Sequence, residues 1–266
     1  MTSLAEPVAN GALPIGQLLD WVPAFAMILA RVGASMALLP GLGEGGAPAP
    51  VRIGMALAIT LLLVPVLAPA LPPMPDSGAA AALMIAGEVI TGLWFGWLAR
   101  IIVLALPVGI QFVAYMLGLS TVLQPDADLG SQSTALAKLF DLAVPVVILS
   151  TGLYQLPLRA LAGLYQVIPA GHLLPVGDSA QLVVQAVGTV FSLALRVASP
   201  FIVAAVAWHV AMGQIARVMS RVQIYFVMMP GQILGGLALL VIVAGTMIEA
   251  WRQGAGTWLA GLPGLG

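Results

Sequence analysis

Long apolar runs, separated by short polar or proline-rich intervals, make up most of the chain. A helix needs about 20 apolar residues to cross a bilayer, and several runs approach or exceed that length: 18–39, 51–71, 79–120, 135–153 with a weaker continuation to 164, and 180–251. No alternation of apolar and polar residues is sustained over the length of a strand. The pattern therefore predicts an all-α fold, that of a polytopic membrane-type helical protein.

Prolines and polar residues divide the two longest runs. Run 79–120 is about twice the length of a span and is interrupted only at Pro107, so it predicts either one long kinked helix or a tight hairpin. Run 180–251 is divided at Pro200 and again at the polar residues 217–223, which predicts one helix leading into a helical hairpin.

The segments outside the apolar runs are short. Residues 1–15 contain one acid, Glu6, and no base, which predicts a polar lead-in rather than a secretory signal. Residues 168–179 are expected to form a loop before the last apolar run. Residues 253–266 are expected to form a Gly-rich tail.

Composition strengthens the membrane assignment. Hydrophobic residues make up 61% of the 266 residues and charged residues 7%, and mean hydropathy is +1.09, whereas an ordinary soluble domain is about 25% charged. So few polar side chains could not cover a water-exposed surface, which argues against a soluble enzyme, and such hydrophobicity also argues against disorder. The net charge of −1 and the scattered bases predict no nucleic-acid partner. With no cysteine, disulfides and thiolate metal sites are excluded.

No motif predicts catalysis, and we expect no catalytic, cofactor-binding or metal-binding residue. Residues 41–46 match the spacing of the dinucleotide fingerprint G-x-G-x-x-G, but that fingerprint needs a preceding strand and a following helix. Here prolines follow at 48 and 50, so a turn is the better interpretation. His172 and His209 each lack an acid or a second histidine at ligand spacing. A loop histidine and a packed helix histidine are therefore favoured over a metal or proton-relay role.

Several charged residues lie among apolar neighbours in the sequence: Arg31, Glu88, Arg100, Asp141 and Arg196. A charge at the centre of a bilayer costs roughly 2.5–3.5 kcal/mol on insertion scales, so it usually faces protein or a wet cavity. One hypothesis is a proton or ion pathway. We favour pairing with partner subunits, or a position outside the hydrocarbon, because no chain of Asp, Glu and His connects these sites. Lys138, three residues before Asp141, is placed to meet it on one helical face.

Small residues and one polar interval complete the pattern. The G-x-x-x-G pairs Gly92/Gly96 and Gly231/Gly235 predict close helix packing. Residues 118–134, between two apolar runs, are rich in Gly, Ser, Gln, Asp and Pro. Their backbone must lie at the surface, in an aqueous lumen or within protein. Composition alone leaves both a plain connecting loop and a lumenal loop open.

Several motifs, taken in order, resemble the FliR/MopE/SpaR family of type III export-gate subunits. The first part comprises Gly87-Glu-Val-Ile-Thr-Gly92-Leu-Trp-Phe-Gly96, a long apolar helix, and then Gly118-Leu-Ser-Thr with Pro125 and Ser131-Gln-Ser. Near the end, Gln223-Ile-Tyr-Phe-Val-Met-Met-Pro230-Gly-Gln-Ile-Leu resembles the family's hairpin turn, which is also similar to one in FliQ. The resemblance covers about residues 18–250.

The resemblance implies a non-enzymatic structural and gating subunit of the flagellar type III export gate, in the bacterial inner membrane at the flagellar basal body. It implies a FliP-like region at 16–179 followed by a FliQ-like region and hairpin at 180–252. The implied partners are FliP, FliQ and FlhB, unfolded flagellar export substrates and membrane lipid, in a hetero-oligomer with one copy of this chain. It implies no cofactor.

The resemblance also assigns roles to residues. The channel plug would lie at about 118–134, and its candidate residues are Gly118, Ser120, Gln124, Pro125, Asp126, Asp128, Gly130, Ser131 and Gln132. The candidate partner contacts near the hairpin turn are Arg217, Arg221, Gln223, Pro230 and Gln232. The two arginines are four apart on one helical face, so we expect them to face the cytoplasm and FlhB. The alternatives are an injectisome export-gate subunit and, from another class, a secondary transporter or small channel, which would need a wet midplane site.

Overall fold

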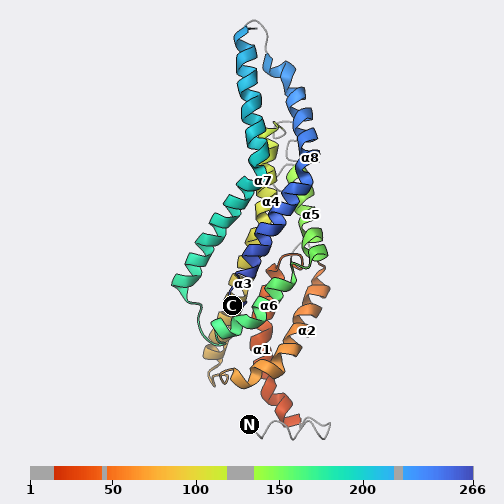
Figure 1. Ribbon diagram of the computed structural model, residues 1–266. Coiled ribbons are helices and arrows are strands. Elements are labelled where there is room, and N and C mark those ends of the chain that lie inside the picture. Colours follow the sequence, from red (N-terminus) through yellow and green to blue (C-terminus); the bar gives the residue numbers. More distant parts are fainter. Residues whose placement is uncertain (1–14, 44–46, 119–134, 219–223, 266) are drawn as a thin grey trace. The chain divides into compact units, whose positions relative to one another are not determined.

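A computed structural model describes residues 15–43, 47–118, 135–218 and 224–265 of the chain (Figure 1). Within these residues the regular structure is entirely helical, which confirms the all-α prediction. The α-helices are α1 (Ile15–Leu38), α2 (Ala49–Leu67), α3 (Gly78–Ile101), α4 (Ala105–Met116), α5 (Ala135–Thr151), α6 (Gln155–Val167), α7 (Val176–Val218) and α8 (Ile224–Ala260). Two short 3-10 turns, η2 (Ala68–Ala70) and η3 (Ile102–Leu104), adjoin them.

Five helical stretches in the described part of the chain are long and apolar enough to cross a membrane: 21–38, 49–70, 78–116, 176–217 and 228–260. The pair α5 and α6 passes the same test only when the two are taken together. The described helices therefore have the lengths and composition of a polytopic membrane protein, as the apolar runs predict.

The long third run folds as a helix with a break, and the hairpin alternative is wrong. Helix α3 continues through η3 into α4 over residues 78–116. Pro107 has no N–H for the carbonyl of residue 103, one turn earlier, and its ring crowds that carbonyl. The 3-10 turn at 102–104 lies at this point, so the chain tightens locally and then resumes an α-helix.

The weak continuation after residue 153 is a separate helix rather than an extension of the same one. Helix α6 is bent by 73° from α5 across a break of three residues. Gly152 lies in this break with a φ of +75°, in the left-handed region that favours glycine. The apolar pattern continues across the break, but the backbone direction does not.

Pro200 does not end a helix, which corrects the predicted division of the last run. It lies inside α7, which is continuous from Val176 to Val218. A proline here leaves the carbonyl of Arg196 without its usual N–H donor, and the Ser199 hydroxyl donates to that oxygen at 2.8 Å. Serine hydroxyls commonly satisfy carbonyls freed by proline in membrane helices. Because α7 begins at Val176, the predicted loop at 168–179 is also shorter than expected.

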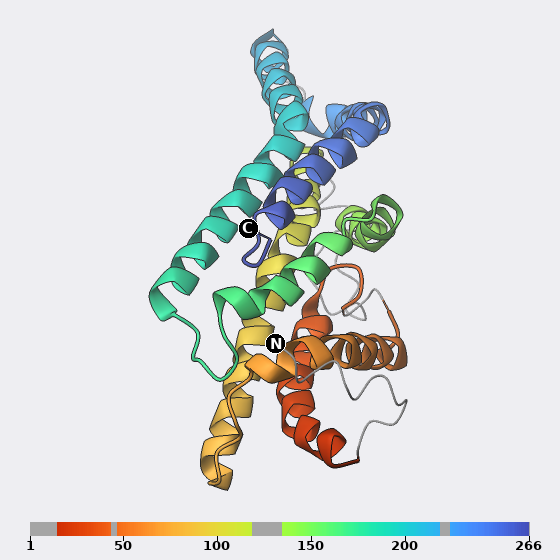
Figure 2. The same cartoon turned by 60° about the horizontal axis from the view of Figure 1, so that its bottom comes forward.

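The chain forms two compact units built from non-contiguous segments. The first comprises residues 1–99, 154–179 and 262–266. In it α1 packs against α2 (Figure 2), and its core includes Met27, Ile28, Met36, Phe95 and Leu98. Within this unit α6 lies against the C-terminal turn, since a Cβ at Gly163 would overlap the carbonyl of Gly264.

The second unit comprises residues 100–153 and 180–261, with α4 packed against α5 and α8. Helices α7 and α8 run antiparallel, because Trp208 lies near Gly231 while Leu193, further back along α7, lies near Gly254, further on along α8. This is the predicted helical hairpin, and its turn at 219–223 lies outside the described residues. Helix α8 continues to Ala260, through the first half of the segment expected to be a Gly-rich tail. The spatial units differ from the linear division at residues 179 and 180, which stays a prediction.

Candidate functional site at the base of the predicted plug loop

The end of α4, where the predicted plug segment begins, is held by a side chain from α8. The Gln232 side-chain amide donates to the carbonyl of Met116 at 2.8 Å. The last four carbonyls of a helix lack intrahelical partners, so this amide satisfies one of them. At Gly118 the backbone turns with a φ of +72°, and its N–H donates to the Tyr115 carbonyl at 3.1 Å. The Gln232 bond therefore fixes the start of the segment to α8, and the Gly118 bond closes the end of α4.

Close packing on α8 supports the same point. Leu117 packs directly against Gly236, where a Cβ would lie 3.0 Å from the leucine Cγ and closer still to one of its methyl groups. Beside this contact is a cavity of about 100 Å³, lined by Leu117, Phe201, Trp208, Gly231, Gln232 and Gly235 among others. The lining is mainly apolar, with one amide that holds a backbone group. Such a lining is suited to holding the end of α4 in place.

Both flanks of the predicted plug segment belong to the second unit. Helix α4 precedes it, α5 follows it from Ala135, and these two helices pack against each other. Of the candidate plug residues, only Gly118 is described. The others lie outside the described residues: Ser120, Gln124, Pro125, Asp126, Asp128, Gly130, Ser131 and Gln132.

The candidate partner-contact residues are divided in the same way. Arg221 and Gln223 lie outside the described residues, while Arg217 is exposed in the last turn of α7 and Pro230 is exposed within α8. Gln232 makes the bond to Met116 described above, and its contact with a partner stays a prediction. Sequence reasoning missed this internal role because the two residues are 116 positions apart.

The two G-x-x-x-G pairs have different surroundings. Gly92 and Gly96 of α3 lie against α1: a Cβ at Gly92 would overlap the carbonyl of Arg31, and one at Gly96 would lie 2.8 Å from that of Ser35. The Ser35 hydroxyl donates to the Gly92 carbonyl at 3.0 Å, which further joins these helices. In the second pair, a Cβ at Gly235 would meet nothing within 4 Å, so this glycine is not required for a close approach within the described residues.

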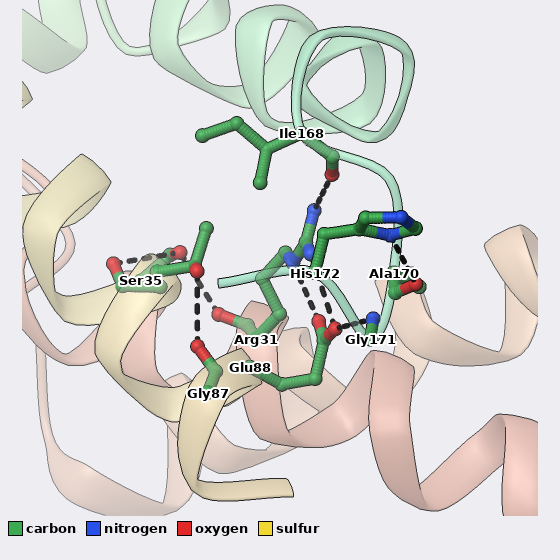
Figure 3. A network of polar contacts seen from close by, with 10 residues as sticks. Arg31, Ser35, Gly87, Glu88, Ile168, Ala170, Gly171 and His172 are labelled. Atoms are coloured by element: carbon green, nitrogen blue, oxygen red, sulfur yellow. Dashed lines mark hydrogen bonds and ion pairs between the residues drawn. The ribbon is translucent and has the colours of Figure 1, made fainter. Parts of the chain in front are cut away.

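A buried ion pair lies in the first unit (Figure 3). The Arg31 guanidinium of α1 donates from Nε to Glu88 Oε2 at 2.6 Å and from Nη2 to Oε1 at 3.1 Å. Both residues are almost completely inaccessible to solvent, at 0% and 1% exposure. The expectation that these charges pair with partner subunits is therefore wrong for Arg31 and Glu88, which neutralise each other within the chain.

The same pair binds the segment between α6 and α7. Arg31 Nη1 donates to the carbonyl of Ile168 at 2.8 Å, and the N–H of Gly171 donates to Glu88 Oε1 at 2.7 Å (Figure 3). The guanidinium carbon also lies 4.2 Å from the centre of the Tyr165 ring, at cation–π distance. Bidentate, charge-assisted hydrogen bonds of this kind fix orientation as well as compensate charge. The network thus joins α1, α3 and the α6–α7 connection.

The other charges in apolar runs have different surroundings. Lys138 Nζ lies 3.2 Å from Asp141 Oδ2 on the exposed face of α5, as their spacing predicts. Arg196 is exposed on α7. The ring Nδ1 of His209 is 2.6 Å from the Ala205 carbonyl, and that of His172 is 3.3 Å from the Ala170 carbonyl.

Residues 41–43 form a turn after α1, in which the Gly43 N–H donates to the Leu39 carbonyl at 2.7 Å. Residues 44–46, the rest of the fingerprint-like motif, lie outside the described residues. Among the described residues, no group of three or more His, Cys, Asp and Glu side chains is placed to hold a metal ion.

The helices and their apolar surfaces define the class as an all-α polytopic membrane protein. The chain belongs to the bacterial export proteins, family 1, whose sequence pattern matches residues 22–257. It is 30% identical over 228 residues to a flagellar biosynthetic protein FliR of Caulobacter vibrioides, covering 86% of this chain and 91% of the relative. Proteins of the same name match at 22% over 242 residues in Bacillus subtilis and at 23% over 227 in Escherichia coli. These matches cover 90% and 84% of this chain, and 93% and 85% of the respective relatives.

Proposed function

We propose that this chain is a gating subunit of the flagellar type III export gate and that its segment at about 118–134 plugs the export channel. The family and the FliR relatives make the chain a component of the flagellar type III export apparatus. Its role there is structural. The proposal adds the plug, and with it a steric mechanism in which the segment closes the lumen to ions until an unfolded substrate passes.

The observation that carries the plug is the anchoring of its base. Gln232 and Gly236 of α8 hold Met116 and Leu117, immediately before the segment, by a hydrogen bond and by packing. The segment returns to the same unit at α5. We expect a plug to be held at both ends, so that it stays at one position in the channel. We also expect it to be polar between its ends, because a polar segment is not tolerated in contact with lipid.

The partners proposed for the chain follow from its place in the apparatus. We propose that one copy assembles with FliP, FliQ and FlhB in the inner membrane at the flagellar basal body, and that unfolded flagellar proteins pass through. The large exposed apolar area supports this: Leu61, Leu62 and Val66 of α2 are 63–73% exposed, as are Val241 and Ile242 of α8 at 77–80%. Such surfaces need lipid or neighbouring subunits to cover them. We further propose that residues 16–179 correspond to a FliP-like region and 180–252 to a FliQ-like region.

An experiment on ion leakage tests the plug. We expect assembled gates lacking residues 125–131 to conduct ions above the intact gate in planar bilayers, because the barrier has been shortened. Gly236→Ala should also raise the leak, since its methyl group displaces Leu117 at the base. Gly235→Ala is the matched control, because its methyl group meets nothing within 4 Å. Unchanged conductance in the deletion, with normal copurification of the partner subunits, would count against the plug.

The contact with FlhB is tested separately. Arg217 is exposed at the end of α7, and we propose that it meets acidic groups of FlhB on the cytoplasmic side. Arg217→Glu should reduce copurification of FlhB, whereas Arg159→Glu, an exposed arginine of α6, should not. Equal FlhB recovery with both variants would remove Arg217 from the interface.

A further inference from the structure

A groove in the first unit lies between α1 and α2. Its volume is about 340 Å³, and its lining is mainly apolar, including Leu29, Gly33, Met36, Ile53 and Leu57. A groove of this size is at the lower end of the range for small-molecule sites. Because no protein side chain of the described residues fills it, it is open to an apolar group from outside.

One cation lines this groove. Arg52, in the first turns of α2, has its Nε buried, and no hydrogen-bond partner is present for that atom among the described residues. A buried donor without an acceptor destabilises the fold, and more so when the group is charged. Arg52 as a whole is partly exposed, so an anion from outside the chain can reach the guanidinium and compensate its charge. The positive end of the α2 helix dipole favours the same sign of ligand.

The position of Arg52 along α2 suggests the kind of molecule. It lies near the end of the span 49–70, where a membrane helix meets the lipid headgroups, and the groove extends from it along the apolar part of the span. Of the residues of α2, only Ala56, Thr60 and Val64 are buried within the chain, so α2 is open to its surroundings. Basic pockets between membrane helices are typical binding places for anionic headgroups.

We propose that this groove binds an anionic phospholipid, with the phosphate at the Arg52 guanidinium and an acyl chain along α1 and α2. A small soluble anion would leave the apolar groove empty. A zwitterionic phosphatidylcholine would place its own positive group near the arginine. The anionic phospholipid satisfies both the charge and the apolar surface, and this site goes beyond the proposed gating role.

Photolabelling of the purified export-gate complex tests the proposal. The complex is placed in nanodiscs that contain phosphatidylglycerol or phosphatidylcholine carrying a photoreactive group in the acyl chain, and labelled peptides of α1 and α2 are counted. We expect about fivefold more labelling by phosphatidylglycerol, the factor typical of one arginine near an anionic headgroup. Arg52→Gln should reduce this labelling to the phosphatidylcholine level. Arg159→Gln, with the same change of charge at an exposed position, should keep the preference.

A second variant keeps the test independent of the arginine. Gly33 lines the groove, and a Cβ there meets nothing within 4 Å. The side chain of Gly33→Leu therefore occupies space in the groove, and this variant should reduce labelling by both lipids. Equal labelling of the native complex by the two lipids, or the same loss in Arg159→Gln as in Arg52→Gln, would overturn the proposal. A photoreactive residue at position 53 that crosslinks to another subunit in place of lipid would also overturn it.

Discussion

Replacing Glu88 with leucine tests whether the buried ion pair is required for the fold of the first unit. The substitution removes the carboxylate and puts an apolar side chain of similar size in its place. It leaves the Arg31 guanidinium buried, with the Ile168 carbonyl as its remaining hydrogen-bond acceptor. It also leaves the Gly171 N–H without its acceptor. The perturbation is therefore an uncompensated buried charge, not a cavity.

The expected cost follows from the burial of both groups. Arg31 is 0% and Glu88 1% exposed, and breaking a buried pair by removing one partner typically costs about 3–5 kcal/mol. Arg31→Met should cost a similar amount, because it strands the carboxylate. The double variant Arg31→Met/Glu88→Leu removes both charges, and replacement of a whole buried pair is often close to neutral. We expect it to lose only the hydrogen bonds to Ile168 and Gly171, about 1–3 kcal/mol.

The measurement is the free energy of unfolding of the full chain in mixed detergent micelles, followed by far-UV circular dichroism. The control is Lys138→Gln, which removes one partner of a pair whose side chains are 51% and 47% exposed, and exposed pairs contribute about 0–1 kcal/mol. If Glu88→Leu costs no more than Lys138→Gln, the buried pair is not required for the fold of the first unit. If the double variant costs the sum of the single variants, the cost of each single variant does not come from an unpaired buried charge.

Two further predictions concern packing inside each unit. Gly92→Ala should lower the free energy of unfolding by about 1–3 kcal/mol, because its methyl group would overlap the backbone of Arg31. Gly87→Ala in the same helix should not lower it, because a Cβ there meets only a side-chain carbon at 3.7 Å. Equal free energies of unfolding for the two variants would exclude the close approach of α3 to α1 as the cause. In the second unit Trp251 is fully buried and its Nε1 donates to the Ile102 carbonyl at 3.4 Å. In thermal unfolding, Trp251→Phe should lower the free energy of unfolding by about 1–3 kcal/mol and Trp251→Ala by about 3–5 kcal/mol. An unchanged free energy of unfolding in Trp251→Ala would show that this core does not hold α8.

The prolines show how far local sequence determines local structure. Pro107 and Pro200 both interrupt an apolar run in the sequence. Pro107 follows a 3-10 turn, whereas Pro200 lies inside an unbroken helix. The difference at Pro200 includes the hydroxyl of Ser199, which satisfies the carbonyl that the proline leaves free. Apolar periodicity likewise continued across Gly152, although its positive φ accompanies a 73° change of direction. Hydropathy reports which residues avoid water but not the direction of the backbone that carries them.

The sequence predicted where along the chain the candidate site lies, but not which residues meet there. The polar interval after the third apolar run was visible because lipid cannot satisfy such a backbone. Its anchoring by Gln232 was not visible, since nothing local to Gln232 or Met116 indicates that the two meet. The groove beside Arg52 was also not predicted, because it requires two helices to be placed side by side.

The sequence by itself determined the class of this protein: helical, membrane-embedded and similar in its ordered motifs to an export-gate family. It did so because span length, composition and motif order are properties of a linear chain. The tertiary structure decided which charges neutralise each other and which glycines permit close contact. Arg31 and Glu88 are 57 residues apart, and their pairing depends on the packing of α1 against α3, where Gly92 allows the backbones to approach. Burial then makes that pairing obligatory, because an isolated charge in such surroundings has neither water nor a counter-ion.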